Sequence, residues 1–324
     1  MKQNQHSAES SMPPGRPIIS QINTPTERIG HYIDYFLVPI VRTQDTYIKD
    51  TTDFINQIES INLPQSCLLI SYDITSMYTN MTFPELIIAV QAALINATEQ
   101  KHYEIPVPEH RDLLFLLKCV LENNVFEFNG QYFRQIIGAA MGAVPSPEIC
   151  DIRMYELTKS IISQYKHNQK ILFHGRYRDD GFLIFNGNRS EAEEFFHIGN
   201  SIHPLLKFTY SISDTSMPFL DTETYKGNRF KNHGILDIKT FIKPTNTFQY
   251  LQRSSAHNDA VFTGFIKGEC IRHARNTSNK DVLHTELCSF KSQLTKRGYS
   301  EKEINPIIKE VYAFDRQQLL IPKL

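Results

Sequence analysis

Two short apolar segments, far apart in the chain, both carry aspartate, and this pattern constrains the fold more than any other feature. Residues 67–74 (CLLISYDI) predict a buried strand with Asp73 near its end. Residues 171–185 predict a hairpin with Asp179 and Asp180 at its tip. Buried strands rarely carry a carboxylate without a reason. If the two segments are neighbours in one sheet, the three carboxylates converge and must either take up protons or bind a cation.

Carboxylate oxygens are hard ligands, which favours Mg²⁺ as the cation. Two such ions roughly 3.5–4 Å apart support in-line phosphoryl transfer. The three aspartates therefore suggest a two-metal site. The alternative is an ordinary polar turn at Asp179-Asp180-Gly181, because Asp-Gly is common in turns. The tripeptide alone favours the turn, and its position between apolar strands favours the metal site.

The rest of the chain predicts a mixture of helices and strands. Pro84-Glu85 and Pro108-Glu109 each open a helix, and Asn129-Gly130 joins two short strands into a hairpin. Ser146-Pro147-Glu148 opens another helix directly after a glycine-rich segment. Further helices are expected over residues 29–61 with a break at Pro39, from Ser190, and from about Asn258, and strands over residues 208–212, 219–225 and 235–241.

The net charge of −1 conceals an uneven distribution. Residues 226–324 carry 17 Lys and Arg against nine Asp and Glu, whereas residues 1–225 carry 17 against 26. A basic C-terminal segment beside an acidic body suggests that one part holds a polyanion while carboxylates act in the other. The alternative is a solvated charged surface, which the charge asymmetry alone favours.

Composition and termini exclude several classes of protein. A chain with 41% hydrophobic and 21% charged residues is expected to fold. Its apolar stretches fall short of the roughly 20 residues that span a bilayer, and its polar first 15 residues predict a flexible arm without a secretory signal. Five cysteines without a C-x-x-C pair argue against a disulfide framework. We expect an intracellular protein, nuclear if the host is eukaryotic, with no membrane partner.

Several segments, in order and spacing, resemble the motifs of one family. Residues 73–80 (DITSMYTN) resemble motif A of reverse transcriptases in the form typical of Penelope-like retroelements. Residues 138–147 (GAAMGAVPSP) resemble motif B, and residues 177–180 (YRDD) resemble the Y-x-D-D box. Residues 219–221 (FLD) and 243–257 are similar to the block after the palm and to the Penelope-type thumb. The ordered combination is specific, whereas any one motif is weak.

The resemblance implies roles at the metal site. Asp73 and Asp179 would be the principal ligands of two Mg²⁺ ions, with Mn²⁺ as a substitute. Asp180 would be the third acid, and the carbonyl of Ile74 a further ligand. Tyr78 would exclude a ribose 2′-hydroxyl and so select dNTPs. For a lone tyrosine after a strand, the alternative is simple core packing.

The resemblance also implies a set of binding residues. Met141, Gly142 and Pro147 would contact the incoming dNTP and the template, and Arg16 would pair with the triphosphate, a geometry suited to guanidinium. The residues implied to position the primer are Phe219, Leu220 and Asp221, and those expected to track the nucleic-acid backbone without reading its sequence are Arg253, Lys267, Arg272 and Arg275.

Cys270, His273, His284 and Cys288 have a spacing that resembles a zinc site. Each pair is also separated by one helical turn. Ordinary helix packing is therefore the favoured interpretation.

Taken with these motifs, the resemblance implies an α+β right-hand polymerase. Its expected parts are a flexible arm at 1–15, partial fingers at 16–66, a palm at 67–225 with a fingers insertion at about 84–137, and a basic thumb at 226–324. The implied activity is RNA-directed DNA synthesis that extends a DNA primer on an RNA template, in a form without the endonuclease that many relatives carry. One alternative is an inactive nucleic-acid-binding remnant of a retroelement, which Arg178 beside the acids and the short fingers favour. A weaker alternative is a Mg²⁺ nuclease.

Overall fold

The computed structural model describes residues 15, 17–103 and 105–321. Arg16 and most of the predicted flexible arm therefore lie outside the described residues. The chain forms two compact units, each assembled from separate segments. Unit 1 comprises residues up to 47, 72–169 and 190–210, and unit 2 comprises residues 48–71, 170–189 and those from 211 onward. Within the described residues, no helix combines the length and apolarity needed to cross a membrane.

Unit 1 is mainly helical. Its long helices are α1 (Glu27–Arg42), α3 (Phe83–Glu99), α4 (His110–Glu122) and α5 (Ser146–Gln164), and α3 packs against both α4 and α5. The start of α3 is a reciprocal cap, in which the Thr82 hydroxyl accepts from the Glu85 amide and the Glu85 carboxylate accepts from the Thr82 amide. The predicted helices are present, and α3 and α5 have a proline in the first turn as expected. Helix α4 begins at His110, so Pro108 lies before its N-cap residue Glu109 and does not open it.

Pro39 lies inside α1 and does not break it, contrary to expectation. Proline removes one backbone hydrogen bond and crowds the preceding turn. The buried face of α1, which includes Phe36, Leu37, Ile40 and Val41, holds the helix together on both sides of the proline. Tertiary packing thus outweighs the local preference.

A short hairpin comes directly after α4 in unit 1. Strands β2 (Val125–Phe128) and β3 (Gln131–Arg134) pair antiparallel, with Phe128 opposite Gln131. Asn129 and Gly130 form the turn and both have positive φ, 51° and 75°. This is the two-residue turn that Asn-Gly favours, so the predicted hairpin is confirmed.

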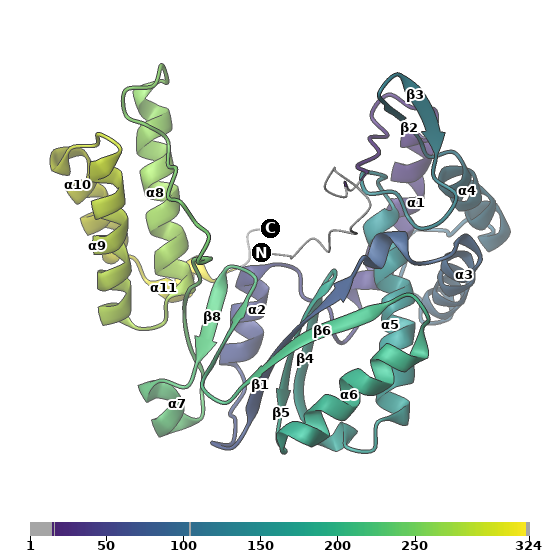
Figure 1. The fold of residues 1–324 in the computed structure, drawn as a ribbon, viewed down its shortest axis with the longest axis horizontal. Coiled ribbons are helices and arrows are strands. Elements are labelled where there is room, and N and C mark those ends of the chain that lie inside the picture. The colour runs from purple at the N-terminus through teal and green to yellow at the C-terminus, as the bar shows by residue number, and fades with distance from the viewer. Residues whose placement is uncertain (1–14, 16, 104, 322–324) are drawn as a thin grey trace, which may run out of the picture. The chain divides into compact units, whose positions relative to one another are not determined.

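A four-stranded sheet has the order β4-β5-β1-β6 (Figure 1). Its strands are β1 (Leu68–Thr75), β4 (Ile171–Tyr177), β5 (Asp180–Phe185) and β6 (Lys207–Ser213), and α6 (Arg189–Ile202) lies between β5 and β6 in the chain. Strands β4 and β5 pair antiparallel up to Tyr177 opposite Asp180. The two acid-bearing segments predicted from the sequence are therefore neighbours in the strand order.

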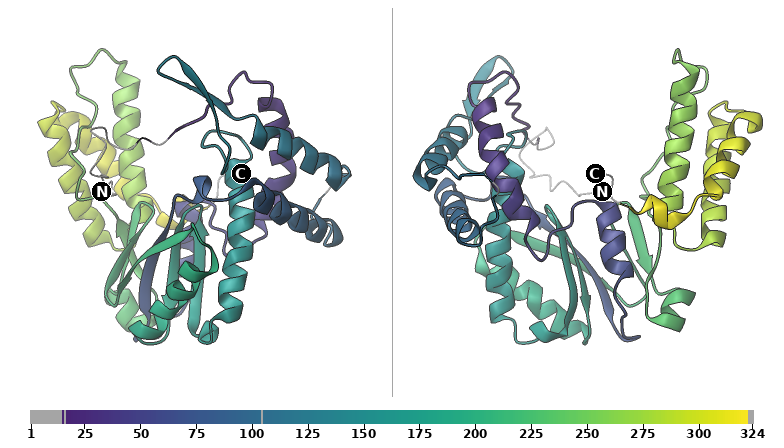
Figure 2. Two further views of the ribbon diagram at one scale, coloured as in Figure 1. Left: turned by 45° about the vertical axis from the view of Figure 1, so that its right-hand side comes forward. Right: turned by 180° about the vertical axis from the view of Figure 1, so that it is seen from behind.

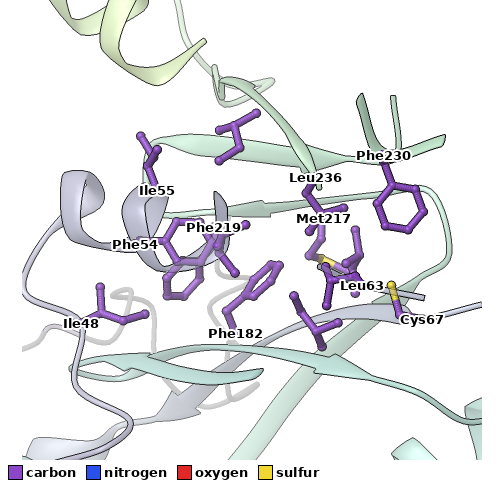
Figure 3. Close-up of a cluster of buried hydrophobic side chains, with 14 of the residues drawn as sticks. Ile48, Phe54, Ile55, Leu63, Cys67, Phe182, Met217, Phe219, Phe230 and Leu236 are labelled. Carbon is purple, nitrogen blue, oxygen red and sulfur yellow. The ribbon is translucent and has the colours of Figure 1, made fainter. Parts of the chain in front are cut away.

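Unit 2 has an aromatic core centred on α2 (Thr51–Glu59) (Figure 3). The ring of Phe54 lies 5.2 Å from that of Phe182 and 4.7 Å from that of Phe219, measured between centroids. These three side chains are buried, and they link α2 with β5 and with the next sheet.

That sheet consists of β7 (Ser216–Phe219), β8 (Thr222–Tyr225) and β9 (Asp237–Thr240), all antiparallel. The single strand predicted over residues 219–225 is wrong, because the chain turns at Leu220-Asp221. Leu220 has φ 54°, a left-handed conformation that apolar side chains seldom adopt and that sequence preference does not reveal. The short helix α7 (Asn228–His233), between β8 and β9, was not predicted.

The C-terminal part of unit 2 is helical, as expected (green to yellow in Figure 2). Helices α8 (Asp259–Asn276), α9 (Lys280–Lys296), α10 (Glu301–Tyr312) and α11 (Arg316–Leu319) follow one another, and α8 packs against α9 and α10. Phe262, Cys270, Leu287 and Phe290 lie in their common core. The described residues thus have a mixed α+β fold with antiparallel strand pairs.

Candidate functional site

Asp73 lies near the end of β1, half-buried, next to the fully buried Ile74. The Thr209 hydroxyl on β6 donates to the backbone carbonyl of Asp73 at 3.5 Å. Directly after the strand, Ser76 has φ 54°, and this left-handed residue turns the chain into the short 3-10 helix η1 (Met77–Thr79). Tyr78 is the middle residue of this short helix and follows the predicted metal-binding acid by five positions.

The glycine-rich motif B segment packs against this turn through its backbone. The Ala139 amide donates to the carbonyl of Tyr78 at 2.7 Å. Gly138 has φ 81°, and a Cβ at this position would collide with the backbone of Tyr78 and Thr79. Only glycine permits both the left-handed backbone and the close approach.

The same segment also meets the chain that follows Arg16. The Ile19 amide donates to the carbonyl of Met141 at 2.7 Å, and a Cβ on Gly142, whose φ is 117°, would collide with the Ile19 carbonyl. We call this arrangement of Ile19, Tyr78, Gly138, Met141 and Gly142 the glycine junction. It brings three of the predicted nucleotide-binding residues together, although Arg16 itself lies outside the described residues. Pro147, also predicted, is half-buried in the first turn of α5.

The other two acids lie in unit 2, at the hairpin of β4 and β5. Asp179 is half-buried in the turn, and Asp180 is exposed at the first position of β5. Arg178 precedes them with φ 57°. The guanidinium of Arg176, which is only 4% exposed, donates from Nη1 to the Arg178 carbonyl at 3.0 Å. The sequence reasoning missed Arg176, although a cation within an otherwise uncharged strand was a readable signal.

The chemistry of the three aspartates suits a hard divalent cation, because their donor atoms are carboxylate oxygens. Asp73 belongs to unit 1, and Asp179 and Asp180 belong to unit 2. Among residues 15, 17–103 and 105–321, no cluster of three or more His, Cys, Asp or Glu side chains is arranged as a metal site.

The zinc-like spacing in α8 and α9 is explained by helix packing. Cys288 Sγ lies 3.6 Å from His284 Nε2, but His273 instead contacts Glu286 at 2.9 Å. Cys270 is buried in the helical core, and burial raises the pKa of its thiol to about 12. In the part of the chain that the structure describes, no three of these side chains come together as a metal site, and their contacts are those of packed helices.

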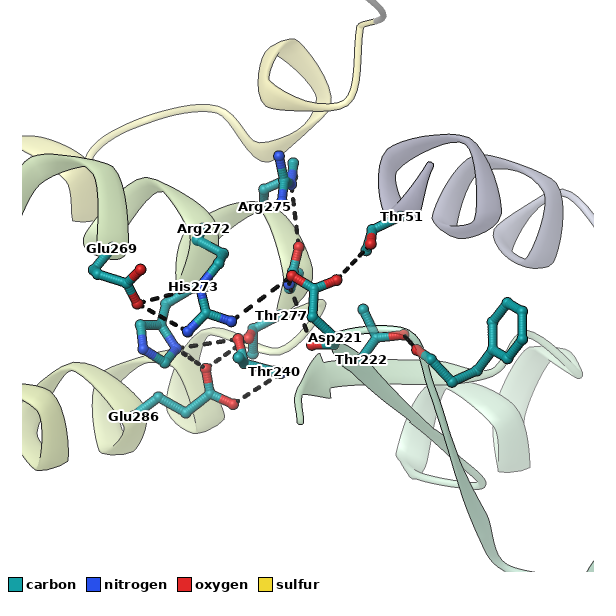
Figure 4. A network of polar contacts seen from close by, with 12 residues as sticks. Thr51, Asp221, Thr222, Thr240, Glu269, Arg272, His273, Arg275, Thr277 and Glu286 are labelled. Atoms are coloured by element: carbon teal, nitrogen blue, oxygen red, sulfur yellow. Dashed lines mark hydrogen bonds and ion pairs between the residues drawn. The ribbon is translucent and has the colours of Figure 1, made fainter. Parts of the chain in front are cut away.

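Asp221 connects the β7–β8 turn to two helices (Figure 4). Its carboxylate accepts from the Thr51 hydroxyl on α2 and, at 3.1 Å, from the Asn276 amide on α8. Arg272 Nη1 on α8 lies 3.7 Å from the same carboxylate. Of the residues predicted to position a primer, Phe219 is buried in the aromatic core and Leu220 packs against it. The third, Asp221, uses its carboxylate for contacts within the protein that hold the β7–β8 turn.

The cations predicted to track a nucleic-acid backbone also have partners within the protein. Lys267 Nζ lies 2.8 Å from Glu310, Arg272 Nη2 lies 2.8 Å from Glu269, and Arg275 donates to the Asn276 side chain at 3.1 Å. Paired charges contribute less to a long-range field than isolated ones. The positive electrostatic potential of this part of the chain is therefore lower than its number of Lys and Arg residues suggests.

Arg253 is the most constrained of these cations. It lies 2.8 Å from both Asp259 and Glu303, and its guanidinium stacks 4.4 Å from the centre of the Phe262 ring. Glu303 also accepts from the Ser300 amide and hydroxyl at the start of α10. The bond from Arg253, followed by those from Ser300, lowers the pKa of Glu303 from 4.5 to about 2. Arg253 thus joins the beginnings of α8 and α10.

A comparison with protein families matches residues 249–309 to the animal helix-turn-helix domain. The match covers α8, α9 and most of α10. No curated protein matches the chain.

Solved polymerase structures share the fold. The telomerase from Candida albicans, in complex with a fragment of telomeric RNA, matches with a TM-score of 0.58 and 12% identity over 92% of this chain and 50% of that one. The RNA-dependent RNA polymerase of a human picobirnavirus matches with a TM-score of 0.52 and 13% identity over 87% of this chain and 50% of that one. Apo telomerase from Candida tropicalis matches with a TM-score of 0.51 and 10% identity over 92% and 55%. The chain has a reverse-transcriptase-like polymerase fold and spans about half the length of these structures.

Proposed function

We propose that the chain is a reverse transcriptase of the Penelope-like type, which adds dNTPs to a DNA primer on an RNA template. The observation that carries this proposal is the glycine junction within a polymerase fold. Two glycines allow motif B to approach Tyr78 and Ile19 at backbone distance. The junction suits a nucleotide pocket, because it fixes the backbone that carries the Tyr78 ring, which would exclude a ribose 2′-hydroxyl.

We further propose that Asp73, Asp179 and Asp180, with the carbonyl of Ile74, hold two Mg²⁺ ions, which Mn²⁺ could replace. The neighbouring order of β1 and β5 supports this assignment. When bound, such ions activate a primer 3′-hydroxyl and stabilise a leaving pyrophosphate. The protein's own contribution is to fix the carboxylates, to exclude a 2′-hydroxyl with the Tyr78 ring, and to receive the base pair against the backbone of Met141 and Gly142.

The proposed function also assigns a role to each segment of the chain. Residues 16–66 and about 84–137 would serve as fingers, residues 67–225 as palm, and residues 226–324 as thumb. The helix-turn-helix match over α8 and α9 supports a nucleic-acid contact in the last of these. Of the four predicted cations, Arg275 is the one for which the described residues provide no ion-pair partner, which favours it as a phosphate contact.

Primer extension on an RNA template with Mg²⁺ and dNTPs tests the proposal, with the Asp179→Asn/Asp180→Asn variant run in parallel. Asparagine keeps the shape of aspartate but loses its charge, so the variant should fold and bind primer–template normally while extension is lost. Binding without extension by either protein would favour an inactive remnant. Degradation of the primer in the absence of dNTPs would favour a nuclease.

A further inference from the structure

Arg176 is a buried cation three residues before the proposed metal ligand Asp179. It lies on β4, where the sequence ILFHGRY otherwise carries no Lys, Arg, Asp or Glu. Burying a guanidinium is unfavourable unless hydrogen bonds compensate for the lost water contacts. A strand could be packed more favourably with an apolar side chain at this position. The contacts of Arg176 should therefore serve a purpose other than stability.

The turn beside Arg176 has an unfavourable backbone. Tyr177 pairs with Asp180, so Arg178 and Asp179 form a two-residue turn. Arg178 has φ 57°, and a left-handed conformation is unfavourable for a residue with a side chain. Turns of this length usually contain glycine or asparagine at such positions. The Arg-Asp turn consequently needs a contact that holds it.

The guanidinium of Arg176 supplies that contact. Its Nη1 donates to the carbonyl of Arg178, the strained residue itself, at 3.0 Å. The backbone of Arg176 is anchored in turn, because its carbonyl accepts from the Ile48 amide at 3.0 Å and the residue lies opposite Gly181 in the β4–β5 pair. Burial, with the nearby Arg176 charge, lowers the pKa of His174 to about 3. His174 is therefore neutral at physiological pH and does not add a second buried cation.

We propose that Arg176 is a positioning residue that holds the Arg178-Asp179 turn in its left-handed form and thereby fixes the carboxylates of Asp179 and Asp180. Its effect on catalysis rests on the proposed function. Its effect on the turn does not, and the two can be measured separately.

The catalytic test uses a double variant. Arg176→Met removes the donors and should lower kcat for primer extension by up to about 100-fold, since a small displacement of catalytic groups has effects of that size. The KM for dNTP and the affinity for primer–template should change little. Adding Arg178→Gly should restore much of kcat, because glycine adopts φ 57° without strain. Arg178→Gly alone provides the reference.

The structural test is hydrogen–deuterium exchange of peptides covering residues 175–185. Exchange should be faster in Arg176→Met and return towards the wild-type rate when Arg178→Gly is added. The control is Arg229→Met, which removes a partly buried arginine of the same unit that bonds Glu59 and the Leu236 carbonyl. This control should lower the melting temperature without altering the hairpin or kcat.

Failure of Arg178→Gly to rescue the exchange rate would overturn the proposal, and so would an Arg176→Met phenotype that matches the control. A wild-type protein that does not extend primers, but whose exchange rates follow the predicted order, would refute the proposed function and leave the positioning role intact.

Discussion

At the scale of single residues, Gly138 and Gly130 have nearly the same left-handed backbone and very different surroundings. Both substitutions to alanine carry a backbone cost of roughly 1–2 kcal/mol. A Cβ on Gly130 meets open space, whereas a Cβ on Gly138 collides with the backbone of Tyr78 and Thr79. Gly138→Ala should therefore lower the free energy of unfolding by about 1–3 kcal/mol more than Gly130→Ala does, which is the usual cost of overpacking. It should also raise the KM for dNTP. Equal losses in denaturant unfolding would show that the glycine junction is not tightly packed.

Tyr78 gives the prediction about substrate choice. Its carbonyl accepts a hydrogen bond from the Ala139 amide, which fixes the backbone from which the ring projects. Tyr78→Ala should raise the use of rNTPs relative to dNTPs by roughly 10- to 200-fold, which is the discrimination that shape alone provides in a pocket. Tyr132→Ala is the matched control, because that ring is 79% exposed on the β2–β3 hairpin. The measurement is the ratio of kcat/KM for dNTP to kcat/KM for rNTP. An unchanged ratio would show that Tyr78 does not select the sugar of the nucleotide.

At the scale of secondary-structure elements, Asp221 connects the β7–β8 turn with α8. Its carboxylate and the fully buried Asn276 amide are 3.1 Å apart. Asp221→Ala should destabilise the protein by about 1–3 kcal/mol, because it removes the side-chain acceptor of the buried Asn276 amide. A double-mutant cycle with Asn276→Ala should give a coupling of about 0.5–3 kcal/mol.

Asp214→Ala is the control for this cycle, since Asp214 is exposed in the preceding turn. It should have little effect on unfolding and no coupling to Asn276. If Asp221 shows no coupling either, the contact does not hold the turn against α8. Extension assays should also show shorter products for Asp221→Ala, because the change loosens the turn that follows the buried Phe219 at the end of β7.

The start of α10 gives a prediction of pH dependence. The folded-state pKa of Glu303 is about 2, below its ordinary value of 4.5. A depressed pKa means that the ionised carboxylate stabilises the fold above pH 4.5, and that this contribution is lost as the pH falls towards 2. Glu303→Gln should therefore be less stable than wild type at about pH 7, with a difference that shrinks below pH 4.5. Urea unfolding across this range measures it, and a constant difference would contradict the assigned contacts.

At the scale of the whole molecule, the sequence predicted most of the features that neighbouring residues encode. The apolar run ending at Asp73, the Asn129-Gly130 hairpin and the helix opened by Ser146-Pro147 appear as expected, because each depends on local pattern. The resemblance also identified Tyr78 and Met141-Gly142, which the structure brings together. The reason for this arrangement, the close backbone approach at Gly138, was not visible in the sequence.

The features that were missed depend on tertiary contacts. The turn at Leu220-Asp221 is held by Asp221 through bonds to α2 and α8, which no local preference reveals. Pro39 remains in a helix because its neighbours are buried. The cations of residues 226–324 looked available in the sequence, but acids such as Glu310 and Glu269 pair with Lys267 and Arg272. The sequence shows how many charged residues the chain has, but the ion pairs among them depend on the fold and could not be predicted.

The most direct measurement of the central claim is single-nucleotide extension of a DNA primer on four RNA templates that differ only in the next base. Each template should direct addition of its complementary dNTP, with Mg²⁺ required. The Asp73→Asn variant should bind the same duplexes and add nothing. Addition that ignores the template base, or undiminished addition by Asp73→Asn, would contradict the account of this chain as an RNA-templated DNA polymerase.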